Sequence, residues 1–428
     1  MSKEECFMTF REVSREQKKS LDYKIDKAVE VLKEAFALSK SAVSVAFSGG
    51  KDSTVLWHLI RTNLPEESYY VIFGNTTVEF PESLKFARRL KREWGDDKAR
   101  FIEVLPERIE EDGLKYEAQK ETLEWLIETG QVHKVLKNDG KLKSTKALEK
   151  SATPEMWEDF RSRGLVWKKG TMKSYRWCVD QYGYPILGKA VSKLTAKRIN
   201  IDCFLRFSST ETQKDEVREY YELLRNVKTS NHCCSILKKE PSEKKQAELG
   251  VDVIIKGLMA SESKSRLMSF ATRGYIFQSS RPHAPEFYHV SPLAIWTDND
   301  IWEYIKRFDV PYSPLYDIEY TNHKGERCRV KRNGCVGCAT DIAFRDNHFS
   351  ALRQTHPWLW DRYMRDGMAE QLICLQRYKT NGLPNYLTVA ESADDAINVR
   401  PCYFDAVGEY MVKDEITESE YDSEEDTL

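Results

Sequence analysis

The sequence predicts an α/β fold in which helices cover both faces of a parallel sheet. Short apolar runs of strand length alternate with helix-length segments over residues 41–104, and the alternation returns after residue 200. A Gly-Gly turn joins the first strand to the helix that follows it. Because parallel strands need long crossover connections, usually helices, this alternation favours a parallel sheet over an antiparallel one.

The elements follow in chain order. Residues 1–40 carry apolar side chains at helical spacing and predict one or two N-terminal helices. Ser41–Phe47 is a Val-rich run typical of a buried strand, and a helix is expected over Thr54–Asn63. The later elements expected are strands at 69–73, 100–104, 201–207 and 251–256, and helices at 81–94, 211–225 and 298–308.

Four regions are expected. The N-terminal helices of residues 1–40 precede a main α/β domain over 41–310, which carries a basic insertion at about 106–200. Residues 311–400 form a cysteine-containing, mostly helical region, and 401–428 an acidic tail. From Asp414 to Leu428 there are eight carboxylates and no Lys or Arg, so this end is expected to be disordered.

Composition excludes several classes of protein. The chain is 41% hydrophobic and 31% charged, an ordinary globular balance. No apolar run reaches the length of a membrane span, and the charged N-terminus has no apolar segment of a secretory signal, so a cytoplasmic protein with no membrane association is expected. Ten cysteines in a reducing compartment indicate metal, cluster or thiol chemistry rather than a disulfide framework.

Charge is unevenly placed along the chain. From Gln131 to Arg198 there are 16 Lys and Arg against 6 Asp and Glu. Two interpretations stand side by side. The stretch is a solvated surface, or it is a landing surface for an anionic partner such as nucleic acid.

The segment Ser48-Gly49-Gly50-Lys51-Asp52-Ser53-Thr54 lies between the first predicted strand and its helix. The two glycines let the backbone approach an anion, and the hydroxyls of Ser48, Ser53 and Thr54 add donors. A helix that starts near Ser53 directs its positive dipole end at a bound phosphate. Lys51 adds a positive charge, and Asp52 is suited to orient Mg²⁺ or to cap the helix. Lys51 and Asp52 are therefore candidate catalytic residues as well.

This loop is not a Walker A loop, and it resembles the loop of the ATP-pyrophosphatase group of adenine nucleotide α-hydrolases, which have a Rossmann-like fold. Three further stretches are similar to the phosphoadenosine-phosphosulfate (PAPS) reductase branch. The first is 73–81, with Asn75, Thr76 and Glu79 beside the nucleotide; the second is 231–241, with its paired cysteines. The third is 255–266, in which Gly257, Glu262, Ser263 and Arg266 are expected to face the nucleotide, but Met259 stands where the family usually has Arg.

Four cysteines are the candidate metal ligands: Cys233 and Cys234, which are adjacent, and Cys335 and Cys338, which form a CxxC. Iron–sulfur clusters take four thiolates, and this arrangement is similar to that of the iron–sulfur adenylylsulfate reductases. The resemblance implies a 4Fe–4S cluster, with Cys328 as the reserve ligand. Zinc on the four thiolates is the competing interpretation.

Cys178 is a separate candidate. Nearby Lys173 and Arg176 would favour its thiolate, so it could carry a persulfide or attack sulfur as a catalytic residue. The other interpretation is a buried structural thiol beside Trp177.

The resemblance leaves the nucleotide open between ATP and PAPS or adenylylsulfate (APS). The intact loop, and a sequence without the Glu-Cys-Gly motif of the thioredoxin-dependent reductases, favour ATP. The chain is then expected to split ATP into AMP and pyrophosphate and to activate an acceptor for sulfur transfer. The ATP-pyrophosphatase component of DNA phosphorothioation systems is of this type. Nucleic acid is a possible acceptor, and a cysteine desulfurase a possible sulfur donor.

Two alternatives remain. One is a reductase or sulfotransferase acting on a phosphosulfate nucleotide. The other is a metal-stabilised nucleic-acid-binding module without catalysis, which explains the basic stretch and the cysteines but gives the phosphate loop no purpose.

Overall fold

The computed structural model describes residues 7–136, 143–183, 211, 232–281, 284–322, 325–338 and 348–363. The chain divides into two compact units: Met1–Leu105 with Lys238–Val336, and Pro106–Leu237 with Gly337–Leu428. The predicted strand at 201–207, almost all of the predicted helix at 211–225 and the acidic tail lie outside the described residues.

The first unit is built on a six-stranded sheet of order β3-β2-β1-β6-β8-β7. Its neighbours are paired in parallel except for β7, which runs antiparallel to β8. The expected α/β fold with a parallel sheet is therefore confirmed. The strands are β1 (Ala42–Phe47), β2 (Tyr69–Gly74), β3 (Ala99–Val104), β6 (Val251–Lys256), β7 (Ile276–Arg281) and β8 (Ala284–Val290).

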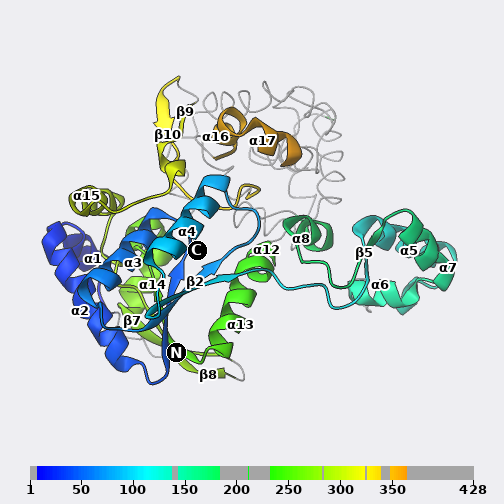
Figure 1. Ribbon diagram of the computed structural model, residues 1–428. Helices are drawn as coiled ribbons and strands as arrows, with labels where there is room; N and C mark the ends of the chain where they lie inside the picture. Colours follow the sequence, from blue (N-terminus) through cyan, green and yellow to red (C-terminus); the bar gives the residue numbers. More distant parts are fainter. Residues whose placement is uncertain are drawn as a thin grey trace. The chain divides into compact units, whose positions relative to one another are not determined.

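Helices cover both faces of this sheet (Figure 1). Side chains of β1 alternate between the two faces, since successive residues of a strand point in opposite directions. Val43, Val45 and Phe47 belong to the main apolar core, in which Phe47 packs against Trp57 of α3. Ser44 faces the other side, where it accepts a hydrogen bond from Gln246 of α13 at 3.4 Å. The helices of this unit are α1 (Phe10–Glu16), α2 (Leu21–Leu38), α3 (Lys51–Asn63), α4 (Pro81–Trp94), α13 (Glu240–Glu248), α14 (Lys264–Arg273) and α15 (Asp298–Phe308).

A buried ion pair joins two helices on the α3 side of the sheet. Lys24 of α2 is 1% exposed and lies 2.6 Å from Asp300 of α15. Asp300 also accepts hydrogen bonds from Thr297, which caps α15. Isolated buried charges are costly, so a paired and hydrogen-bonded Lys24 fixes how α2 and α15 pack.

The remaining elements of the first unit are short. They comprise 3₁₀ turns at Ala260–Glu262 and Pro314–Asp317 and a two-stranded antiparallel sheet of β9 (Glu319–Thr321) and β10 (Arg327–Arg329).

The second unit contains most of the expected insertion. It has more regular structure than its polar composition indicated. Strand β4 (Gly113–Leu114) pairs with β5 (Val166–Trp167), three helices lie between these strands in the sequence, and a fourth follows β5. Its helices are α5 (Tyr116–Glu128), α6 (Thr145–Ser151), α7 (Pro154–Ser162), α8 (Tyr175–Tyr182), α12 (His232–Cys234), α16 (His348–Thr355) and α17 (Pro357–Tyr363), with a 3₁₀ turn at Val132–Lys134. A π-helical turn, Ser235–Lys239, leads from α12 into α13.

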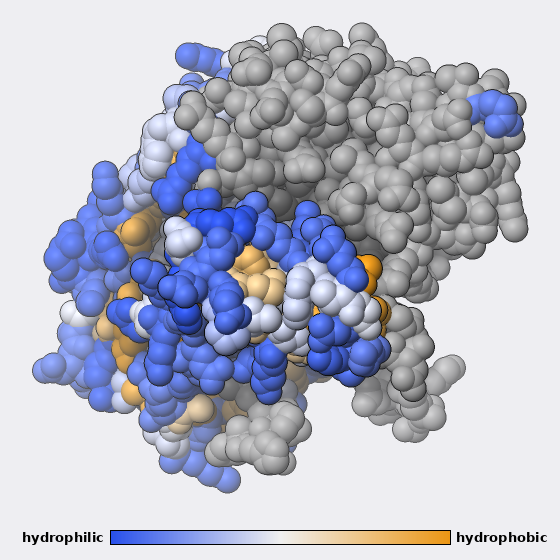
Figure 2. All heavy atoms as spheres, turned by 90° about the vertical axis from the view of Figure 1, so that its right-hand side faces the viewer, coloured by the Kyte–Doolittle hydropathy of each residue, from blue (hydrophilic) through white to orange (hydrophobic). Residues whose placement is uncertain are grey.

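Among the described helices, none combines the length and apolar character needed to cross a membrane. The described residues on the face shown in Figure 2 are mostly hydrophilic, with small hydrophobic patches between them.

Candidate functional site

Three neighbouring parallel strands end at the same edge of the sheet. Phe47 at the end of β1 is paired with Phe73 of β2, and Ala46 with Lys256 at the end of β6. From β1 the chain proceeds to β2 and β3 on one side, whereas β6 lies on the other side. This is a topological switch point, where open α/β sheets bind ligands outside the carboxyl ends of their strands.

The phosphate loop lies at this edge and has a fixed backbone. Gly49 has φ +72°, a left-handed conformation that favours glycine. The hydroxyls of Ser53 and Thr54 both donate to the carbonyl of Gly50, at 2.9 and 3.0 Å. The amide of Thr54 also donates to that carbonyl, so α3 begins at Lys51, three residues before the expected start. Gly50 is the N-cap and supplies no side-chain cap, which leaves the helix end facing the loop.

Lys51 is buried and held by three groups. Its ammonium lies 3.1 Å from Asp52 and 2.7 Å from Asp298, and 5.7 Å from the ring centre of Tyr316. The Lys51 amide donates to the Tyr316 hydroxyl at 3.2 Å. Burial works against its charged form, but the attraction of Asp52 and the Asp298 hydrogen bond outweigh it, so the pKa of Lys51 is raised. The charged form of Lys51 is therefore favoured, in an ion pair with Asp52 and Asp298.

For the neighbouring Asp52 and Arg266, unlike Lys51, the pKa shift disfavours the charged form. Burial raises the pKa of Asp52 above its ordinary value, against the opposing effect of Lys51. Burial, followed by the charge of Arg332, lowers the pKa of Arg266, and Asp52 opposes that shift. The cations Lys51, Arg266 and Arg332 thus lie near the loop together with the carboxylates of Asp52 and Asp298.

The segment after β2 is ordered by its own polar side chains. Asn75 donates to Glu103 at 2.6 Å and accepts from the amide of Thr77, while Thr76 donates twice to Glu79 Oε1. Asn75 and Thr76 are buried. The other oxygen of Glu79, Oε2, is buried and accepts no hydrogen bond within the described part of the chain. Glu79 therefore has a carboxylate oxygen available to a ligand.

The segment after β6 closes the other side of the loop. A Cβ at Gly257 would lie 3.2 Å from the carbonyl of Asp52, so glycine here allows close packing against the start of α3. Glu262 accepts from the amide of Met259 and is ion-paired with Arg266. Ser263 caps α14 by accepting from the Arg266 amide.

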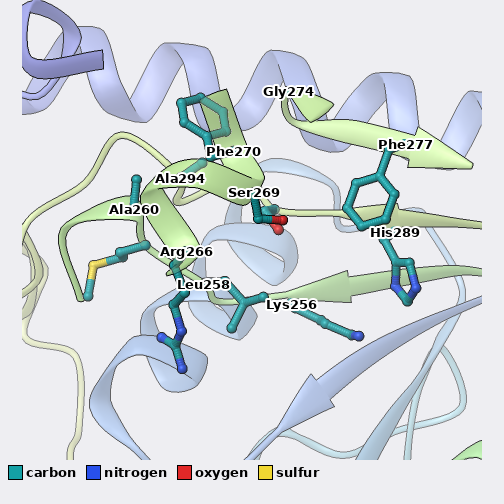
Figure 3. A pocket seen from close by; sticks show the side chains of 12 residues that line it. Lys256, Leu258, Ala260, Arg266, Ser269, Phe270, Gly274, Phe277, His289 and Ala294 are labelled. Atoms are coloured by element: carbon teal, nitrogen blue, oxygen red, sulfur yellow. The ribbon is translucent and has the colours of Figure 1, made fainter. Parts of the chain in front are cut away.

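A cavity of about 110 Å³ lies between this segment and the strands β7 and β8. In Figure 3 Arg266, Leu258 and Lys256 lie along one part of it, and Phe277 and His289, whose rings are 4.9 Å apart, lie together at another. Pockets that enclose whole ligands usually measure about 300–1,000 Å³. The cavity is therefore smaller than a pocket that encloses a whole ligand.

The predicted cysteines are divided between the units. Cys335 lies in the first unit, with its sulfur 3.6 Å from Thr76 Oγ1 and its backbone bridged to Glu79. Cys328, on β10, accepts from Asn322 in the same unit. Cys178, Cys233, Cys234 and Cys338 belong to the second unit. Among the described residues no three His, Cys, Asp or Glu side chains are spaced to hold a single metal ion.

Four residues of the site were missed by the sequence analysis: Asp298, Tyr316, Arg332 and Asn333. Asp298 was identified only as the start of a helix, and Tyr316 lies in a turn after Pro314. Asn333 donates to the Ser48 carbonyl at 3.2 Å. Each is more than 240 positions from the loop, and no local pattern in the sequence marks such a contact.

The fold and this edge define a class: α/β proteins with a glycine-containing loop, Ser48–Thr54, at the switch point of a mostly parallel sheet. The family described as "Phosphoadenosine phosphosulfate reductase domain" matches residues 42–153 and 185–340. Since the match covers more than half of the 428 residues, the chain belongs to the PAPS reductase domain family.

The relatives are distant. A phosphoadenosine 5'-phosphosulfate reductase of Xylella fastidiosa (strain M23) is 37% identical over 92 residues, which is 22% of this chain and 35% of the relative. An adenosine 5'-phosphosulfate reductase of Lysinibacillus sphaericus is 26% identical over 196 residues, 37% of this chain and 80% of the relative. The chain therefore spans about a third of the length of the Xylella relatives. A solved PAPS reductase from Candida auris, a phosphate complex, has a TM-score of 0.32 at 13% identity and covers 69% of this chain and 89% of its own.

Proposed function

We propose that the chain is a sulfur-metabolism enzyme that splits ATP into AMP and pyrophosphate to activate an acceptor for sulfur transfer. The observation that carries the proposal is the loop at Ser48–Thr54, with buried Lys51 at the N-terminus of α3. A helix N-terminus and a lysine together bind a phosphate chain. The pyrophosphate end of ATP would lie here, where charge develops as the bond to the α-phosphorus breaks.

The proposed reaction has two balanced steps. A nucleophilic oxygen of the acceptor attacks the α-phosphorus of ATP, and pyrophosphate leaves with the bridging oxygen and its electron pair. Sulfide, released from the donor's persulfide by a dithiol that is oxidised to a disulfide, then forms a bond to the acceptor atom, the bond from that atom to its oxygen breaks, and AMP leaves with that oxygen and its electron pair. Lys51 would bind the leaving pyrophosphate, and Arg266 with Arg332 would add positive charge beside it.

Mg²⁺ fits the donors at this edge. It is held by one or two carboxylates together with substrate phosphates, and Asp52 is a half-buried carboxylate beside the loop. A bound Mg²⁺ would neutralise phosphate charge. Asp52 would hold it, and Lys51 would then be left to contact the phosphates.

The family resemblance also implies a 4Fe–4S cluster, for which Cys233, Cys234, Cys335 and Cys338 were predicted with Cys328 in reserve. The donors present are thiols, which suit iron–sulfur clusters and zinc alike. The cluster would bind or relay sulfide. A cysteine desulfurase as donor and a nucleic acid as acceptor, bound through the basic stretch, complete the proposal.

A reductase acting on PAPS or APS is the second candidate. The names of the relatives from Xylella and Lysinibacillus favour it. The two functions differ in their products, since the first releases pyrophosphate from ATP and the second releases sulfite from a phosphosulfate nucleotide.

An anaerobic assay of the full chain with each nucleotide separates them. It would measure pyrophosphate from ATP, with DNA or RNA as acceptor, and sulfite from PAPS or APS with a dithiol. Replacing Lys51→Ala removes a charged contact worth about 1.5–3 kcal/mol, and should lower pyrophosphate release about 10- to 150-fold. Lys98→Ala, at an exposed ion pair with Glu66, is the matched control and should be active. Sulfite release without pyrophosphate release would replace the first function by the second.

A further inference from the structure

Helix α8 in the second unit contacts both segments that carry the predicted cluster ligands. Near its start, the Tyr175 hydroxyl donates to the carbonyl of Gly337, inside the CxxC segment, at 2.7 Å. At its end, the Tyr182 ring stacks on His232, the residue before Cys233, with ring centres 4.9 Å apart. Figure 1 shows α8 and α12 side by side. One helix therefore ties the paired cysteines to Cys338.

Glycine is required where α8 meets the CxxC segment. A Cβ at Gly337 would lie 2.5 Å from the Tyr363 ring and 3.0 Å from the Tyr175 ring. These two rings pack edge to face, with centres 5.7 Å apart. The backbone next to Cys338 is thus packed against two aromatic rings.

Cys178 lies on the face of α8 that makes these contacts. Tyr175, Cys178 and Tyr182 are at positions i, i+3 and i+7, which share one side of a helix. Cys178 is fully buried. Helix α8 packs against α12, which carries Cys233 and Cys234, and its Tyr175 ring lies against Gly337, next to Cys338. The side of α8 that carries Cys178 therefore lies against both cysteine segments.

We infer that Cys178 is a cluster ligand together with Cys233, Cys234 and Cys338, so that all four thiolates come from the second unit. This inference rests on the cluster in the proposed function and changes its fourth ligand. Cys335 belongs instead with the nucleotide segment, where its sulfur contacts Thr76 and the next amide, of Val336, donates to the Val78 carbonyl at 2.7 Å.

Among the described residues the thiols are not gathered closely enough to hold one metal ion, as a zinc site requires. Four thiolates on one zinc ion, each at about 2.3 Å, must approach one another to about 3.8 Å. No such group is present among the residues that the structure describes. In a 4Fe–4S cluster each thiolate binds a different iron, so the sulfurs lie farther apart.

The test compares Cys178→Ser with Cys335→Ser in the full chain, purified anaerobically and reconstituted with ferrous iron and sulfide. Iron and sulfide per chain, visible absorption and the electron paramagnetic resonance spectrum of the reduced protein are measured. The wild type is expected to hold four irons. Cys178→Ser should lose most of the iron or keep it with an altered spectrum, because serine oxygen is a poor substitute ligand, and Cys335→Ser should match the wild type.

Wild-type iron content and spectrum in Cys178→Ser, or iron loss in Cys335→Ser, would overturn the assignment, as would a wild type that binds no iron. Far-ultraviolet circular dichroism of the unreconstituted variants separates ligand loss from unfolding. If Cys178→Ser is unfolded, two experiments replace it: the variant Cys178→Ala, and alkylation of the wild type before and after iron removal. Cys178 of the wild type should be alkylated only after the iron is removed. Alkylation of Cys178 with iron bound would contradict the inference. Pyrophosphate release from ATP tests the proposed function independently.

Discussion

Gly49 offers the most direct test of the phosphate loop. Its φ of +72° is in the left-handed region, where an alanine costs about 1–2 kcal/mol. A Cβ there would also lie 3.3 Å from the Ser83 carbonyl, which belongs to the backbone of α4 and cannot move aside as a side-chain tip can. Gly49→Ala should therefore drive the loop out of its present conformation.

The strain converts into a loss of affinity. If ATP binds only to the loop conformation seen here, the full cost of about 1–2 kcal/mol is subtracted from the binding free energy. Since each 1.4 kcal/mol is about tenfold, ATP should bind about 5- to 30-fold more weakly. Isothermal titration calorimetry with a non-hydrolysable ATP analogue measures this directly.

Gly164 provides the matched control. Its φ is +71°, and a Cβ there would meet nothing within 4 Å. It lies in the second unit, outside the proposed nucleotide site. Gly164→Ala should lower the free energy of unfolding by a similar backbone cost but leave ATP affinity unchanged. Equal ATP affinity in Gly49→Ala and wild type would refute the assignment of the loop as the phosphate site, and equal losses in both variants would reduce it to a general effect of stability.

Two further predictions follow from charges near the loop and in α3. The side chain of Asp298 is 64% exposed, and in the proposed site it competes with phosphate for Lys51. Exposed ion pairs contribute roughly 0.2–1 kcal/mol, so Asp298→Asn should bind ATP up to about fivefold more tightly. Weaker binding in calorimetry would show that Asp298 supports the ligand. Burial, followed by the charge of Arg61, lowers the pKa of His58, so the unfolded chain binds a proton more readily than the folded one and stability falls as pH drops below 6.5. Urea unfolding should then show a smaller loss between about pH 7 and 5 in His58→Gln than in the wild type, and equal losses would contradict this cause.

Much of the first unit could be predicted because its signals are local. The helices at Pro81–Trp94 and Asp298–Phe308 and the strand at Val251–Lys256 have the bounds expected from periodicity and caps. The hairpin of β7 and β8 was not predicted. Its two strands have no clear alternation of apolar and polar residues, and prolines at 282 and 285 interrupt the pattern.

Only the site residues that lie within short sequence motifs could be predicted. The motif between a strand and a helix identified Ser48–Thr54, and the resemblance to the PAPS reductase branch identified Asn75 and Gly257. Two of the three partners of Lys51, Asp298 and Tyr316, come from segments more than 240 residues away, and Asp298 resembles any acidic first-turn residue of a helix. Such contacts depend on how elements pack, and packing leaves no signature at a single position.

The CxxC segment shows the same limit in the metal site. Its spacing indicates that two thiols can reach one metal core, but it does not show that both of them bind the same metal site. The chain passes from one unit to the other between Val336 and Gly337, inside the motif. For Cys178 the sequence indicates a helix face, which it shares with Tyr175 and Tyr182. Nothing in the sequence shows that this face contacts Gly337 and His232. Ligand sets inferred from spacing therefore need the packing of the intervening helices before the fourth ligand can be assigned.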